Sequence, residues 1–253
     1  MKIRGFTLIE MIVTIVIGSI IMLGIAAYLS LGVQGYSDSI ARQRLQTQAQ
    51  FVIEKMSREI RHAVPNSFEV TQSDQCLSFF PISMAGFYSR RGVKTLDFIV
   101  GSLKANGDSY DEIPDGLRMI INPSHYDDFY MSTTDMDVGG KKKVDGVYSI
   151  SEVNVFSSDS IGNRFYLFNP NIGVRYCWDR DKKMLIRGNI STDKHGNNDI
   201  VNVVTISDHV SSLTFSYEPR SLHSGGIVNI NLGFEQNGEN SVYQQDVQVL
   251  NVP

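Results

Sequence analysis

The feature that most constrains this 253-residue sequence is a long apolar stretch close to its N-terminus. It begins at Phe6 and extends to about Tyr28, and Ile, Val, Leu and Met dominate it. Between Phe6 and Gln34 the only charged side chain is that of Glu10. The run exceeds the ~18 residues needed to span a membrane, and as a helix it would be roughly 35 Å long. We therefore expect a helix that lies in lipid, where all backbone groups must be satisfied internally.

Glu10 needs a physical reason to lie in such a stretch. A charged side chain at the centre of a bilayer costs on the order of 2.5–3.5 kcal/mol, and less near the end of a span. Because Glu10 is near the start of the run, one interpretation is a tolerated interfacial carboxylate. The other is a carboxylate kept for a cationic partner in an assembled state. Composition does not separate the two.

The charges around the stretch predict its orientation. Lys2 and Arg4 precede it, and the next basic residues are Arg42 and Arg44. Basic residues beside a span favour the cytoplasmic side, so most of the chain is expected outside the cytoplasm. A cleaved secretory signal is the alternative, but its apolar core has only ~7–15 residues and precedes a small-x-small site. The segment 26–30 offers no convincing site of that kind.

The beginning of the chain resembles the class III signal of type IV pilins and type II secretion pseudopilins. The residues that carry this resemblance are Lys2, Arg4, Gly5, Phe6, Thr7, Leu8, Ile9 and Glu10. It implies a leader of residues 1–5, a cut between Gly5 and Phe6 by the prepilin peptidase, and N-methylation of Phe6 by the same class of enzyme. It also implies that Glu10 pairs with the N-terminal amine of a neighbouring subunit during assembly.

A second helical pattern follows the apolar stretch. Apolar residues recur at steps of four and three, which places them on one stripe of a helix, and they are Ala41, Leu45, Ala49, Val52, Met56, Ile60 and Ala63. Pro65 disfavours continuation of the helix beyond this point. We expect 6–28 as the membrane or filament-core segment and 29–64 as an amphipathic continuation. A loop near Gly32 and Gly35 would instead divide it into two helices.

The residues from 65 to 253 are predicted to form a β-rich head. Alternation of apolar and polar residues is clear in its second half, for example at Val228, Ile230, Leu232 and Phe234. The segment from about 101 to 146 is rich in Gly, Asp and Ser and predicts a loop-rich insertion with one clear strand, at 117–121. The expected fold class is α+β: a long N-terminal helix packed on an antiparallel β-sheet head, as in type IV pilins.

The chain has two cysteines, Cys76 and Cys177, both in the part expected outside the cytoplasm. Two independent buried thiols are one interpretation. An even count in an oxidising compartment favours a disulfide. A bridge that closes a loop of about 100 residues would stabilise the fold by up to ~4–5 kcal/mol.

The sequence contains no recognisable catalytic constellation, so we expect neither an enzymatic activity nor a cofactor. A net charge of −4 gives no support to nucleic-acid binding. Two groups of oxygen-bearing side chains are weak candidates for calcium, although neither has EF-hand spacing and a polar loop is the simpler interpretation. One group is Asp193, Asn197, Asn198 and Asp199, and the other is Asp108, Asp111, Glu112 and Asp115.

Further resemblance extends beyond the leader to 41–68 and 247–253, where the chain is similar to the larger minor pilins and J-type pseudopilins. The resemblance implies a structural subunit that waits in the inner membrane and then enters a pilus at the cell surface. Its partners would be other pilins and an inner-membrane assembly platform. A type II secretion pseudopilin and a membrane-anchored adhesive module that never polymerises are the alternatives.

Overall fold

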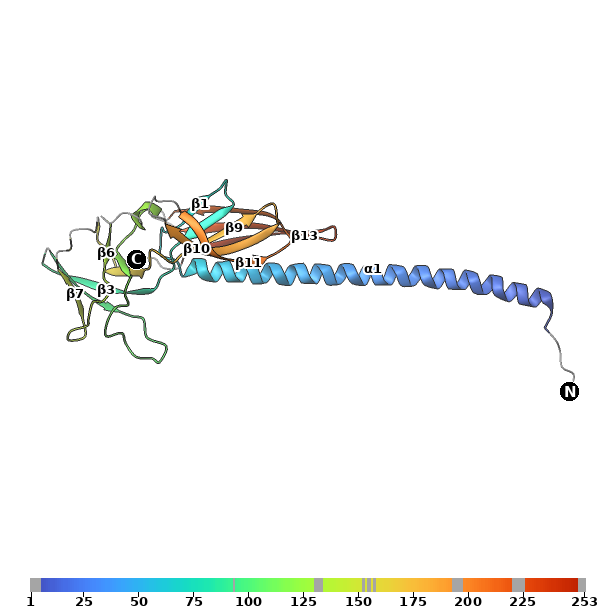
Figure 1. Cartoon of the computed structure of the whole chain (residues 1–253), viewed down its shortest axis with the longest axis horizontal. Helices are drawn as coiled ribbons and strands as arrows, with labels where there is room; N and C mark the ends of the chain where they lie inside the picture. The colour runs from blue at the N-terminus through green and yellow to red at the C-terminus, as the bar shows by residue number, and fades with distance from the viewer. Residues whose placement is uncertain are drawn as a thin grey trace.

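In this computed structural model the described residues are 6–92, 94–129, 134–151, 153, 156, 158–192, 198–219 and 226–249. Figure 1 shows a long helix that projects from a β-rich head, with the N-terminus at the far end of the helix. The head has two parts. The proximal lobe comprises 69–79 and 173–248 and packs on the helix, whereas the distal lobe, 84–168, lies beyond the end of the helix (Figure 1).

The helix α1 runs without interruption from Leu8 to Arg61, a total of 54 residues. Gly32 and Gly35 are helical and a Cβ at either position would meet no neighbour, so the alternative of two separate helices is wrong. The helix ends in a turn where the N–H of His62 donates to the carbonyl of Glu59 at 3.2 Å and the N–H of Ala63 donates to that of Ile60 at 3.1 Å. This agrees with the expected stop before Pro65.

The second half of α1 buries the stripe that the periodicity predicts. We call these helical residues the buried stripe: Ala41, Leu45, Ala49, Val52, Met56 and Ile60. Ala63 is also buried, just beyond the helix. Complete burial of a Leu, Val or Met side chain stabilises a fold by roughly 1.5–3 kcal/mol, so the stripe is a substantial attachment between helix and head.

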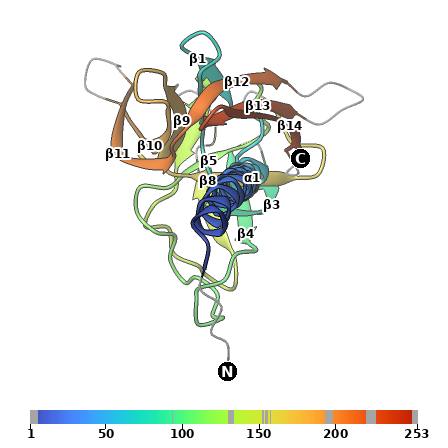
Figure 2. The ribbon, with the colours of Figure 1, turned by 90° about the vertical axis from the view of Figure 1, so that its right-hand side faces the viewer.

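The proximal lobe covers the buried stripe with two antiparallel sheets. Figure 2, which looks along α1, shows them arching over the helix. The first sheet has the order β1-β2-β9-β10-β11, with bounds Glu69–Thr71, Cys76–Phe79, Gly173–Asp179, Met184–Thr192 and Asn198–Ser207. The second has the order β12-β13-β14, with bounds Val210–Glu218, Ile227–Gln236 and Glu239–Gln248.

The inward face of the three-stranded sheet follows the alternation read from the sequence. Val228, Ile230, Leu232 and Phe234 of β13 are buried and belong to the same apolar core as the buried stripe. Because the side chains of a strand alternate between its faces, the intervening residues of β13 point away from the helix.

The distal lobe is a six-stranded antiparallel sheet with the order β6-β5-β8-β3-β4-β7. In the same order the bounds are Asp135–Asp137, Arg118–Ile120, Arg164–Phe168, Met84–Arg91, Thr95–Val100 and Tyr148–Ser151, and a 3-10 helix, η1, spans Tyr126–Phe129. It has an apolar core of its own, which includes Leu96, Phe98 and Phe165. A smaller cluster joins the lobes, in which the ring centroids of Phe80 and Phe129 are 5.3 Å apart.

The structure confirms the α+β class but divides the head into three sheets, where the sequence indicated one. The segment 101–146 contains η1 and β6 in addition to the expected strand, observed as β5 at 118–120. Both strands join the six-stranded sheet. Except for the hairpin of β3 and β4, the strand pairs of this lobe connect residues far apart in the chain, and the spacing of apolar residues along one strand does not specify its neighbours.

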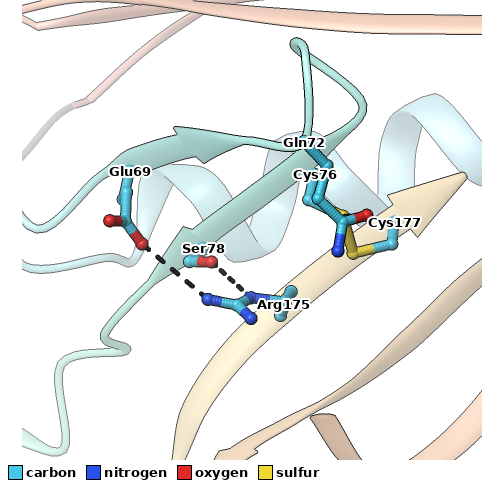
Figure 3. Close-up of a disulfide and its surroundings, with 6 residues drawn as sticks. All are labelled: Glu69, Gln72, Cys76, Ser78, Arg175 and Cys177. Atoms are coloured by element: carbon cyan, nitrogen blue, oxygen red, sulfur yellow. Dashed lines mark hydrogen bonds and ion pairs between the residues drawn. A yellow bond between two sulfur atoms is a disulfide. The ribbon is translucent and has the colours of Figure 1, made fainter. Parts of the chain in front are cut away.

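Cys76 and Cys177 form a disulfide, as the sequence predicts. They face each other in the register of β2 and β9, and 101 positions separate them. The chain between them includes the entire distal lobe, so the bridge closes the base from which that lobe extends. Beside it, the buried Arg175 donates to the hydroxyl of Ser78 at 2.7 Å and lies 3.8 Å from a carboxylate oxygen of Glu69 (Figure 3).

Candidate assembly surface

The first half of α1 is not covered by any other described part of the chain. Every side chain from Phe6 to Ile40 is exposed, and most are large and apolar. By length and composition this helix could cross a membrane. Thr14 and Ser19, two of its hydroxyl side chains, donate to the carbonyls of Met11 and Val16, at 2.9 and 2.8 Å. Because these hydroxyl groups are hydrogen-bonded within the helix, placing them in an apolar environment costs much less free energy than placing unbonded hydroxyls there.

Glu10 lies in the first turn of α1 and is exposed. A carboxylate there interacts favourably with the positive end of the helix dipole. No ion pair of Glu10 is found within the described part of the chain. Phe6, the residue expected to become the N-terminus, has 77 % of its surface exposed, whereas Gly5 and the rest of the leader lie outside the described residues.

The second half of α1 is held to the head by polar contacts as well as by the buried stripe. Glu59 accepts from Arg187 of β10 at 2.9 Å and from Lys55 at 3.1 Å. Burial alone would raise the pKa of the Glu59 carboxyl. The hydrogen bond and charge of Arg187, together with Lys55, outweigh it and hold that pKa below its ordinary value. Arg187 also lies over the ring of Tyr176, 5.9 Å from its centroid.

A second polar contact involves the turn between β11 and β12. The amide of Gln48 donates to the hydroxyl of Ser207 and to the carboxylate of Asp208, both at 2.6 Å. The hydrogen bond of His209 and that of Gln48 lower the pKa of Asp208. Closer to the exposed half of the helix, Arg42 forms an ion pair with Glu239 at 3.0 Å. Together these contacts fix the angle at which the exposed half of α1 leaves the head.

The calcium candidates acquire no supporting geometry. Asp193 and Asn197 lie outside the described residues, as do the side chains of Asn198 and Asp199. In the other group, Asp111 pairs with Lys104 at 3.4 Å and Glu112 lies 4.0 Å from Lys142. Across the described parts of the chain no three His, Cys, Asp or Glu side chains are grouped so that they could hold a metal ion.

The sequence did not indicate the polar contacts between helix and head. Gln48 and Glu59 are surface residues by pattern, because neither lies on the apolar stripe. Their partners Asp208 and Arg187 are more than one hundred residues away. The only local indication of such a contact is a polar residue beside an apolar stripe, and most residues in that position are solvent-exposed without a partner.

Comparison with known families gives one match, and it falls on the N-terminal part of α1. The family described as "Prokaryotic N-terminal methylation motif" matches residues 1–26, which cover the leader and most of the apolar run. Neither a comparison with curated proteins nor one with solved structures found a match. The motif, the exposed apolar helix and the α+β head together support a type IV pilin-like protein. Its signal implies processing by the prepilin peptidase and assembly with other pilins.

Proposed function

We propose that this protein is a structural minor pilin of a type IV pilus, of the MshO type found in mannose-sensitive haemagglutinin pili. The observation that carries the proposal is the exposed apolar half of α1 directly behind a methylation motif. More than 30 consecutive exposed positions, from Phe6 to Ile40, require lipid or the helices of other subunits as their surroundings.

In the proposed pathway, the leader 1–5 is removed in the inner membrane and Phe6 becomes the methylated N-terminus. Residues 6–28 then pass from the bilayer into the core of the filament. Glu10 pairs with the N-terminal amine of a neighbouring subunit. Such a pair gains importance only when both charges leave water, because a buried charge without a partner is strongly unfavourable.

The proposed topology has a cytoplasmic N-terminus, a single span and a periplasmic head. The amphipathic segment 29–64 connects the span to the head, 65–253. The partners are other minor and major pilins, the prepilin peptidase and N-methyltransferase, and the inner-membrane assembly platform. After assembly, the head is on the pilus at the cell surface.

The distal lobe supports a place at the start or tip of the filament. It lies beyond the end of α1, on the side away from the membrane anchor (Figure 1). In a stack of parallel helices, the next subunit outward would need the space that this lobe occupies. A subunit that initiates assembly or caps the tip has no such neighbour.

A J-type pseudopilin of type II secretion is the second candidate, since the same motif serves both systems. Deleting the gene and measuring pilus attachment and exoprotein release separates them: a minor pilin affects the first and a pseudopilin the second. A membrane-anchored adhesive module would keep its Met1, whereas both filament subunits would carry N-methyl-Phe6 by mass spectrometry.

The decisive test is replacement of Glu10 by Ala, with Asp38→Ala as the control in an exposed position of the same helix. We expect surface pili to be lost or severely reduced in Glu10→Ala, with normal levels of protein in the membrane. Asp38→Ala should assemble normally. Normal piliation of the Glu10 variant, counted by electron microscopy, would contradict the proposed role.

A further inference from the structure

The strand β14 forms a long open edge of the proximal lobe. It has ten residues, Glu239–Gln248, and all ten pair with β13 in continuous register. Among the described strands, only β13 pairs with it. Its other edge therefore presents backbone N–H and C=O groups that no described strand pairs, which is the usual template for strand addition. One of these groups, the carbonyl of Asp246, accepts from the side-chain amide of Gln245 at 2.8 Å.

The other sheet edges are short, irregular or partly covered. β1 and β6 have three residues each and β7 has four. β11 is long, but its register with β10 shifts twice. β12 is next to the turn before β2, where the N–H of Phe215 donates to the carbonyl of Asp74 at 2.8 Å. Short strands and bulges are the devices by which proteins prevent edge pairing, and β14 has neither.

The hairpin geometry identifies the backbone groups that point outward. Asn237 and Gly238 have φ values of 53° and 82° and form a two-residue turn, so Gln236 and Glu239 form its closing hydrogen-bonded pair. Hydrogen-bonded and non-hydrogen-bonded pairs alternate from there. The outward groups therefore belong to the even-numbered residues from 240 to 248. None of the ten residues is Lys or Pro, and the two charged ones, Glu239 and Asp246, are near the ends of the strand.

A groove of about 930 Å³ runs between this edge and α1. Ile53 and Tyr243 are half-buried and provide apolar surface in it. The charged side chains that line it are the guanidinium groups of Arg58 and Arg61 and the carboxylate of Glu54, and the imidazole of His62 is beside them. The groove therefore has an apolar floor, an excess of positive charge and a strand edge along one wall.

We propose that β14 accepts a fourth strand, an extended segment of another protein that carries a carboxylate directed at Arg58. The backbone of the added strand pairs with the even-numbered residues of β14. Its alternate side chains enter the groove over Ile53 and Tyr243. Strand addition of this kind draws affinity from main-chain hydrogen bonds and specificity from the side-chain pockets. The site goes beyond the proposed assembly function, because it does not involve Glu10 or the apolar half of α1.

A second copy of this chain does not fit the site in a membrane. β14 runs along α1 (Figure 1), and an antiparallel pairing of two β14 strands about a two-fold axis would reverse one α1 relative to the other. Two copies anchored in the same bilayer through α1 have parallel helices. The partner therefore presents a different segment.

The test uses full-length protein in detergent micelles and a random ten-residue peptide library displayed on phage. Enriched peptides are synthesised with a fluorescent label, and their dissociation constants are measured by anisotropy. We expect alternating peptides with one or more Asp or Glu. Gln244→Pro removes an outward N–H and leaves the pairing with β13 intact, so it should weaken binding by about tenfold or more, while Gln244→Ala changes it by less than about twofold.

The charge is tested separately with Arg58→Gln, which should weaken binding by about threefold or more, with a difference that shrinks at high salt. Circular dichroism melts check that each variant is folded. Equal binding of the enriched peptides to wild type and Gln244→Pro, or no enrichment over Gln244→Pro, overturns the strand-acceptor site. Enrichment of peptides without a carboxylate overturns the part assigned to Arg58, and self-association through β14 in sedimentation overturns the choice of partner. None of these results depends on pilus formation.

Discussion

The two halves of α1 are parts of one helix and have opposite relations to the rest of the chain. From Phe6 to Ile40 no side chain is buried, and from Ala41 to Arg61 the apolar stripe lies in the core of the proximal lobe. From Phe6 to Val33 the helix is apolar on nearly all sides, whereas the part from Ala41 onward is apolar on one side only. The difference teaches that hydrophobicity alone does not locate a core: the most apolar part of this chain lies entirely outside it.

The largest expected effect comes from equal truncations in the two halves. Leu45→Ala removes a fully buried side chain and should lower the free energy of unfolding of the head by about 2–5 kcal/mol. Leu23→Ala removes a side chain that is 72 % exposed and should leave that free energy unchanged within about 0.5 kcal/mol. Urea unfolding in detergent, followed by the fluorescence of Trp178, measures both. Similar losses in the two variants would refute the division of the helix.

A smaller effect is expected from the ion pair between helix and sheet. Glu59→Gln leaves the half-buried Arg187 without its carboxylate and should cost about 1–3 kcal/mol. Glu54→Gln changes the same chemical group five residues earlier in the helix, in an exposed position, and should cost less than about 0.5 kcal/mol. The same unfolding assay compares them, and an equal cost would mean that the contact of Glu59 adds nothing.

The pH dependence of stability should follow from the same carboxyl. Its pKa in the folded protein is below the ordinary 4.5, so its contribution is complete above about pH 4.5. As the pH falls through the lower folded value, Glu59 takes up a proton and that contribution is lost. Glu59→Gln should therefore lose less stability than wild type over this acid range. Parallel curves for the two proteins would show that another group is responsible.

The smallest effect is expected within the exposed half, near the middle of α1. A Cβ at Gly32 would meet no neighbour, and Ala favours a helix over Gly by about 0.5–1 kcal/mol. Gly32→Ala should slow amide hydrogen exchange of the surrounding turns by about two- to fivefold, without changing the unfolding of the head. Unchanged exchange would mean that neighbouring turns, and not this glycine, limit local opening.

The sequence predicted the features that depend on local periodicity. The buried stripe and the alternation of β13 are predictable because each is a repeat along one element. The end of α1 is predictable because Pro65 disfavours a helical conformation in the residue before it. The disulfide was predicted from cysteine count and compartment. These features fix the α+β class and the place where helix and head meet.

The arrangement of strands in the head could not be predicted from the local spacing of apolar and polar residues. β3 was missed because its residues, Met84–Arg91, contain a glycine and end in two arginines without clear alternation. Gly86 is nonetheless required there, since a Cβ would lie 1.9 Å from the carbonyl oxygen of Ile99. The contacts of Gln48 and Glu59 were missed for a related reason, as their partners are brought close only by the finished fold.

The position of the disulfide has a mechanical consequence. In the pilus that we propose, the filament is pulled at the cell surface, and tension between the anchored end of α1 and the last strand, β14, would travel along the chain through β2 and β9. At Cys76 the covalent bridge offers a shorter route, directly to Cys177. In that filament the load would pass across the base of the distal lobe, and its six strands would carry none of it. That lobe can keep its shape, and whatever it presents to its surroundings, while the rest of the subunit is under strain.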